Sequence, residues 1–169
     1  ARNKGWLVQR RHNRLSYVGF DRAIALNTRQ EKLADRQVRE ALTAMFDYEW
    51  VNRALHHGVY QRPTSYFFGS HLASAGTPTQ AERQLLEPFR ELLPTGLFNE
   101  PFDLPGSTGS GYNRDAKLIA KELFLKAGWQ YRDGALRNAD GEKFTLRFVV
   151  RNPTERRLVL PYASYLRHI

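Results

Sequence analysis

The chain has 169 residues, of which 41% are apolar and 12% aromatic, with 26 Lys and Arg against 17 Asp and Glu. This composition supports a packed core rather than a disordered chain, and no apolar run approaches the roughly 18 residues that a membrane-spanning helix needs. The absence of cysteine excludes disulfides, thiolate metal sites and cysteine nucleophiles.

The net charge of +9 leaves a nucleic-acid or membrane-surface partner open. Basic residues are concentrated at the start of the chain, at Arg2, Lys4, Arg10, Arg11 and Arg14. We expect residues 1–20 to form a basic lead-in segment that is solvated or packs against parts of a larger protein, with a nucleic-acid footprint as the alternative. Because the sequence has neither an initiating methionine nor an N-terminal signal, we expect a processed product or a fragment.

A short strand and a long helix are the first predicted elements. Residues 22–27, "RAIALN", alternate as a strand does. Apolar residues then recur at helical spacing and predict one helix over about residues 36–56, with Asp35 as its N-cap and Gly58 as its stop. An ordered loop is expected over residues 58–78.

Prolines and caps define the middle of the chain. Thr79 and Glu82 have the spacing of a capping box and predict the start of a helix, which Pro88 must kink or split. Residues 94–112 are rich in proline and glycine and predict a second long loop. Such loops are uncommon in compact domains unless they carry a function or cover a surface. Asn113 is then expected to cap a helix over about residues 114–127.

The last third of the chain predicts a hairpin, a strand and a helix. Asp133-Gly134 and Asp140-Gly141 are strong turn signals. Alternating apolar residues then predict a strand with one buried face: Phe144, Leu146, Phe148 and Val150. A final helix begins near Thr154. This order of elements predicts an α/β fold, with α+β as the alternative, in which helices pack on a mixed sheet.

No motif commits the chain to catalysis or to metal binding. No two of the five histidines have the i, i+4 spacing that places two imidazoles on one helix face. The stretch "GSTGSG" at 106–111 lacks the context of a phosphate-binding loop, so we interpret it as a flexible linker or lid. We therefore predict no enzyme, no catalytic residue, no metal and no cofactor.

The junction between the predicted strand and the last helix is a candidate ligand site. In open α/β sheets, ligands bind where a strand ends and a helix begins. Arg151 can pair with a carboxylate, and Asn152 and Thr154 can hydrogen-bond to a peptide backbone. The alternative interpretation is a capped helix start with a surface arginine.

Several segments resemble one family in the same order. A strand that ends at Asn27 is followed by Asp35, Val38-Arg39, Ala41-Leu42 and Phe46-Asp47. "AKELFLKAGW" (120–129), "DGALRNADGEKFTLRFVV" (133–150) and "LPYASYLRHI" (160–169) come later. This order resembles the bacterial extracellular solute-binding proteins that serve oligopeptide, dipeptide and nickel ABC importers. "FDYEWVNRALHHGVYQRPTSYF" is similar to the subgroup that includes the periplasmic component of the microcin C-type peptide importer.

The resemblance implies a two-lobed, cleft-closing receptor in the periplasm. Such a receptor captures oligopeptides and delivers them to an inner-membrane ABC permease, without catalysis, metal or cofactor. It also implies that residues 21–169 form part of a C-terminal lobe, and it places Asp21, Arg22 and the loop from Arg151 to Thr154 toward the cleft. A nucleic-acid-binding module is not expected but stays an alternative, as does a receptor for a non-peptide solute.

Overall fold

The computed structural model describes residues 18–19 and 22–169. They fall into two units, one of residues 24–62 and 104–169, and the other of residues 63–103 with the described start of the chain. Most of the lead-in segment predicted for residues 1–20 therefore lies outside the described residues. Among the residues that are described, no helix is long and apolar enough to cross a bilayer.

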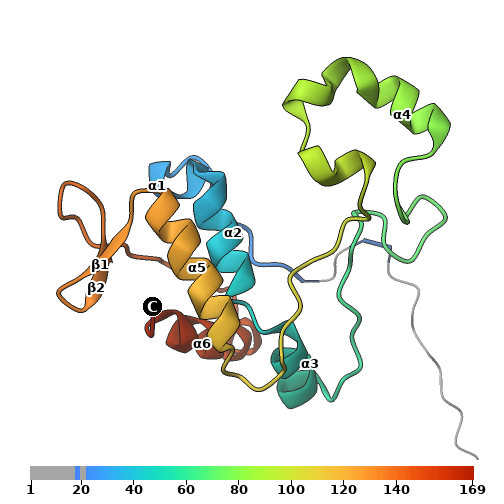
Figure 1. Cartoon of the computed structure of the whole chain (residues 1–169). Helices are drawn as coiled ribbons and strands as arrows, with labels where there is room; N and C mark the ends of the chain where they lie inside the picture. Colours follow the sequence, from blue (N-terminus) through green and yellow to red (C-terminus); the bar gives the residue numbers. More distant parts are fainter. Residues whose placement is uncertain (1–17, 20–21) are drawn as a thin grey trace, which may run out of the picture. The chain divides into compact units, whose positions relative to one another are not determined.

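The larger unit combines helices with one hairpin (Figure 1). Its helices are α1 (Glu31–Ala34), α2 (Arg36–Ala44), α3 (Tyr48–His56), α5 (Arg114–Lys126) and α6 (Pro153–Leu166). Its strands, β1 (Gln130–Arg132) and β2 (Ala135–Arg137), pair antiparallel. Asp133 and Gly134 connect them with φ angles of 48° and 73°, as an Asp-Gly hairpin turn requires. This combination of helices and a small sheet agrees with the expected α/β class.

The helix predicted over residues 36–56 is divided into α2 and α3, so the prediction of one continuous helix is wrong. Asp35 caps α2 as expected, since its side chain accepts a hydrogen bond of 2.6 Å from the Gln37 amide. A second cap interrupts the apolar stripe, because the Asp47 carboxylate accepts from the Trp50 amide at 2.9 Å and begins α3. The helix predicted after Asn113 is confirmed as α5, and Asn113 is its cap.

The core of this unit lies where α2, α5 and α6 meet. Helices α2 and α5 lie side by side (Figure 1). Helix α6 contributes Tyr162 and Tyr165 to the core. The core side chains are Leu33, Val38, Ala41, Leu42, Met45, Ala120, Phe124, Tyr162, Tyr165 and Ile169. The hydroxyl of Tyr162 donates to the Leu42 carbonyl at 2.7 Å, and burial raises the pKa of this tyrosine. The hydrogen bond satisfies a polar group that would otherwise destabilise the core.

The segments 22–27 and 144–150, which were predicted as strands, form no ladder with a neighbouring strand among the described residues. Both strand predictions are therefore wrong. A strand needs a hydrogen-bonded neighbour. The described residues provide one only at an isolated bridge between Arg137 and Lys143, and at the Phe144 amide, which donates to the Leu136 carbonyl at 2.8 Å. The predicted alternation of side chains is confirmed for Phe144, Leu146 and Phe148, which pack against the core, but not for Val150, which is exposed.

The smaller unit contains α4 (Gln80–Leu86) and the 3₁₀ helices η2 (Glu87–Leu92) and η3 (Thr95–Phe98). The capping box is confirmed, since the Thr79 amide donates to the Glu82 carboxylate at 2.7 Å and the Glu82 amide donates back to the Thr79 hydroxyl at 3.4 Å. Hydrogen bonds from the Thr79 hydroxyl, at 2.7 Å, and from the Thr79 amide to the Glu82 carboxylate lower the pKa of Glu82. The predicted effect of Pro88 is also confirmed, because α-helical geometry ends at Leu86 and the tighter 3₁₀ helix follows.

We predict that Tyr162 makes stability fall at alkaline pH. Its folded pKa is above the ordinary value of 10.0, so its contribution is complete below pH 10 and is lost as the pH rises through the folded pKa. Tyr162→Phe should flatten this decline and lower the unfolding free energy at neutral pH by about 1 kcal/mol. Urea unfolding between pH 7 and pH 11 measures both effects. Tyr131→Phe, at an exposed position, is the control and should keep the wild-type slope.

Candidate ligand-binding sites

The carboxylate of Asp47 holds a loop against the start of α3. Its side chain is buried, and it accepts hydrogen bonds from the Trp50 amide at 2.9 Å, the Ser107 hydroxyl at 2.5 Å and the Gly111 amide at 2.9 Å. Hydrogen bonds to an ionised acceptor are stronger than neutral ones. One side chain therefore begins a helix and also fixes the path of the loop over residues 105–113.

Further bonds fix the same loop along its length. The Arg62 guanidinium donates to the Pro105 carbonyl at 2.6 Å, and the Arg53 guanidinium donates to the Gly109 carbonyl. Near its end, the Asn113 amide donates to the Tyr165 hydroxyl at 2.8 Å, and that hydroxyl donates to the Asn113 carbonyl at 2.6 Å. The stretch predicted as a flexible linker or lid is therefore held by hydrogen bonds along its length, and a role as a lid stays a prediction. Whether the long loop predicted over residues 94–112 carries a function or covers a surface also stays a prediction.

Tyr165 lies between the loop and the core. Burial raises the pKa of its hydroxyl, and the negative charge of Asp47 and the nearby Tyr112 add to this effect, against a lowering by the hydrogen bond with the Asn113 backbone. The phenol is therefore neutral at physiological pH and serves as a donor and an acceptor at once. Its role in this geometry is to position the loop.

Two glycines let the loop pass close to α3. Gly109 and Gly111 have φ angles of 67° and 77°, a region that favours glycine. A Cβ atom on Gly111 would lie 2.9 Å from Nε1 of Trp50, and one on Gly109 would lie 3.2 Å from the Arg53 guanidinium. Gly109 and Gly111 of "GSTGSG" thus serve close packing, whereas nothing lies within 4 Å of a Cβ atom at Gly106.

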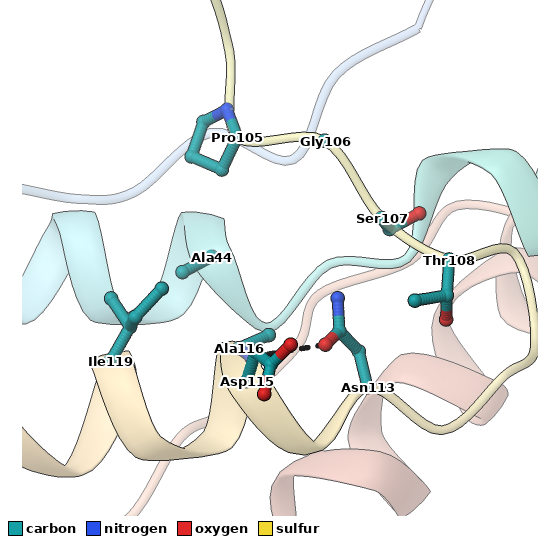
Figure 2. A pocket seen from close by; sticks show the side chains of 9 residues that line it. All are labelled: Ala44, Pro105, Gly106, Ser107, Thr108, Asn113, Asp115, Ala116 and Ile119. Atoms are coloured by element: carbon teal, nitrogen blue, oxygen red, sulfur yellow. Dashed lines mark hydrogen bonds between the residues drawn. The ribbon is translucent and has the colours of Figure 1, made fainter.

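A hollow of about 250 Å³ lies between this loop and the start of α5 (Figure 2). The loop from Pro105 to Thr108 borders one side, and Asn113, Asp115 and Ile119 border the other. The Asn113 side chain is turned back to the Ala116 amide at 3.1 Å, as the dashed line in Figure 2 marks. Ligand pockets for drug-sized molecules measure about 300–1,000 Å³, so this hollow suits a small group or one side chain.

A second hollow, of about 270 Å³, is bordered mainly by aromatic rings. Trp50, Tyr112 and Tyr162 supply flat apolar surface, and Asp47 and His168 supply polar atoms at its border. Aromatic side chains contribute large contact areas and, in Trp and Tyr, a polar tip. This hollow can therefore accept an apolar or aromatic side chain of a ligand. Within the described residues, no cluster of three or more His, Cys, Asp or Glu could hold a metal ion.

The predicted ligand residues of α6 form a capped helix start. The Arg151 guanidinium donates to the Glu155 carboxylate at 2.6 and 2.9 Å, and the Arg151 amide donates to it at 2.7 Å. The Asn152 side chain accepts from the Glu155 amide at 2.9 Å. Thr154 lies in the first turn and is exposed. The geometry therefore corresponds to the alternative interpretation, and a role in ligand binding stays a prediction.

Two further residues, Asp21 and Arg22, were predicted to face the cleft. Asp21 lies outside the described residues, and Arg22 is exposed and belongs to the smaller unit. The sequence reasoning also missed Asp47 as an organising residue. An aspartate followed by an acidic residue and a tryptophan in its first turn is an N-cap signal, and it could have located the start of α3.

Comparison with known proteins decides the family. The family model described as bacterial extracellular solute-binding proteins, family 5, middle region, matches residues 11–169. The chain belongs to family 5. The resemblance found in the sequence is thereby confirmed, and so is the α/β class that goes with it.

Individual proteins that are similar in sequence agree with this assignment. A putative binding protein of Brucella melitensis is 38% identical over 141 residues, which are 83% of this chain and 23% of that protein. The probable peptide-binding protein YejA of Agrobacterium fabrum is 34% identical over 153 residues, 90% of this chain and 25% of the relative. The peptidoglycan-binding protein YepA of the same organism is 29% identical over 144 residues, which are 85% of this chain and 23% of YepA. The chain thus spans about a quarter of the length of these relatives.

We predict that Gly111→Ala destabilises this family 5 chain. The substitution adds a Cβ atom against the Trp50 ring at a positive φ, so it should lower the unfolding free energy by about 1 kcal/mol or more. Gly106→Ala is the matched control, because nothing lies within 4 Å of its Cβ position and its φ is not positive. Urea unfolding of both variants tests this. Equal stability of the two would contradict the close packing of the loop on α3.

Proposed function

We propose that this chain is part of the substrate-binding component of an ABC importer, which captures oligopeptides in the periplasm and delivers them to an inner-membrane permease. The observation that carries the proposal is the family 5 match over residues 11–169. The YejA relative, a probable peptide-binding protein, supports a peptide as the ligand. Because the chain spans about a quarter of its relatives, the activity belongs to a longer polypeptide.

In this proposal, residues 21–169 supply part of one lobe and the start of α6 lies toward the cleft. The pair between Arg151 and Glu155 is well suited to exchange partners, because the Arg151 side chain is 87% exposed. Exposed pairs of this i, i+4 kind stabilise a helix by only about 0.3–0.5 kcal/mol. A ligand carboxylate can therefore replace Glu155 on the guanidinium without a large loss of stability, while Asn152 keeps the helix capped.

Broad recognition would follow from the character of the two hollows. Each has room for about one side chain, and the second is lined mostly by apolar and aromatic side chains that would accept many different side chains of a ligand. Hydrogen bonds to a peptide main chain, together with hydrated side-chain pockets, would hold many sequences alike. Closure of two lobes about a hinge would bury the ligand.

A peptidoglycan fragment is the second candidate ligand. The observation that favours it is the similarity to YepA, a peptidoglycan-binding protein. Such fragments join a sugar to a short peptide. Because they are not simple peptides, they correspond to the alternative of a receptor for a non-peptide solute. A nucleic-acid partner is suggested only by the charge of +9.

We predict that short peptides raise the melting temperature of the complete gene product. A ligand that binds only the folded state stabilises it by RT ln(1 + [L]/Kd), which is about 2.7 kcal/mol at a hundredfold excess over Kd. A thermal-shift series with peptides, peptidoglycan fragments and duplex DNA makes the comparison. Stabilisation by DNA alone, with a steep loss of affinity as salt increases, would replace the proposal by the nucleic-acid alternative.

We predict that Arg151→Ala weakens binding of peptides with a free C-terminal carboxylate and leaves binding of amidated peptides unchanged. A charge-assisted pair with a carboxylate contributes about 1.5–3 kcal/mol, which corresponds to a tenfold or greater change in Kd. Titration calorimetry of the complete gene product measures it. Arg157→Ala is the matched control, since Arg157 is also exposed on α6. If both variants bind both kinds of peptide equally well, Arg151 has no contact with the ligand.

A further inference from the structure

The second hollow, of about 270 Å³, has flat apolar walls and a polar border, and we call it the aromatic hollow. Its aromatic rings come from Trp50, Tyr112, Tyr162 and Tyr165. The Tyr162 and Tyr165 hydroxyls donate to backbone carbonyls, so these polar tips are already used within the protein. Pockets for drug-sized ligands measure about 300–1,000 Å³, so the aromatic hollow has room for one ring rather than for several.

Polar groups at the border of the aromatic hollow have unused hydrogen-bonding capacity. An ionised carboxylate offers about four acceptor positions. Three described donors use the Asp47 carboxylate, which leaves room for one more. The Ser164 hydroxyl and the His168 imidazole also border the hollow, and neither makes a hydrogen bond to a residue that the structure describes. A ligand with several hydroxyl groups can therefore be bound along one edge.

Charge and hydration narrow the kind of ligand that fits the aromatic hollow. The Asp47 carboxylate would repel an anion. The Lys117 ammonium lies 4.5 Å from the centroid of the Tyr112 ring and 5.5 Å from that of Tyr165, so these rings already hold a cation and a second one would be repelled. A wholly apolar group would displace water from the polar border without replacing its hydrogen bonds. The ligand that remains is an uncharged ring with an apolar face and a polar edge.

We propose that the aromatic hollow binds the uncharged ring of a sugar. A pyranose ring has a face of C–H groups that packs on aromatic rings, and an edge of hydroxyls that bond to carboxylate, hydroxyl and imidazole groups. This site is separate from the proposed peptide site, because α6 rises about 16 Å from Pro153 to Ser164. A sugar in the hollow leaves the start of α6 free, so the inference does not depend on peptide capture.

The test is titration calorimetry of the complete gene product with N-acetylglucosamine and with glucose. One sugar ring makes few contacts and binds with a Kd on the order of 1 mM, so the titration runs well above that concentration. Saturable binding that a saturating peptide leaves unchanged is the expected result. If a sugar binds and no peptide does, the proposed function fails and this inference stands.

Three results would overturn the inference. The first is that neither sugar binds saturably. The second is that peptide competes with the sugar, since the two sites would then be one. The third is that p-cresol, which has the ring of a tyrosine side chain, binds more tightly than either sugar, since the hollow would then be an apolar side-chain pocket. A soluble glycan fragment of peptidoglycan serves as a further arm, and tighter binding of this fragment than of the single sugars would make a glycan chain the source of the ring.

Variants of Tyr112 locate the site. The ring of Tyr112 borders the hollow and is 60% exposed, so its removal costs little packing. Tyr112→Ala should weaken sugar binding by about tenfold, whereas Tyr112→Phe keeps the ring and should bind within about twofold of the wild type. Tyr131→Ala is the matched control, at a tyrosine of β1 that is 59% exposed and outside the hollow. Melting temperatures show that each variant is folded. Equal sugar binding by Tyr112→Ala and the wild type would place the sugar elsewhere and overturn the inference.

Discussion

The buried carboxylate of Asp47 is the interaction on which the rest of the larger unit depends. It ends one helical stripe, begins α3 and accepts hydrogen bonds from a loop some sixty residues later in the chain. Both hollows border the loop or the carboxylate that holds it. Residues of the loop line the first hollow, and Asp47 itself lines the second. A buried acceptor with several donors is stabilising only while all of them are present, so the loop and α3 form one cooperative element.

Helix α6 connects this element to the core. The Tyr162 hydroxyl donates to the Leu42 carbonyl of α2, and the Tyr165 hydroxyl donates to the Asn113 carbonyl at the end of the loop. Two tyrosines of one helix therefore connect α6 to α2 and to the loop. The start of the same helix carries Arg151 and Asn152. A candidate binding residue at the end of a helix that is fixed at two points is held more accurately than one on a free loop, which is the arrangement that recognition needs.

Local signals in the sequence were sufficient for much of this fold. Caps and turns depend on neighbouring residues, so Thr79 with Glu82, Asn113 and Asp133-Gly134 could be predicted correctly. Contacts between distant residues could not. The path of the loop depends on the contacts of Ser107 and Gly111 with Asp47, and the strand pairing predicted for residues 22–27 and 144–150 is not found among the described residues. The glycine-rich stretch at 106–111 looked flexible because its composition does not reveal that Trp50 and Arg53 lie against it.

The unpaired segment also bears on how this chain behaves when it is handled alone. "FTLRFVV" (144–150) is rich in β-branched and aromatic residues, has one charge and contains no proline, which is the composition of an aggregation-prone window. Arg147 interrupts it at the centre, and Lys143 and Arg151 flank it. Natural proteins place charged gatekeepers in this way around exposed edges. Part of the positive charge that first suggested nucleic acid therefore lies where charged residues oppose self-association in other proteins.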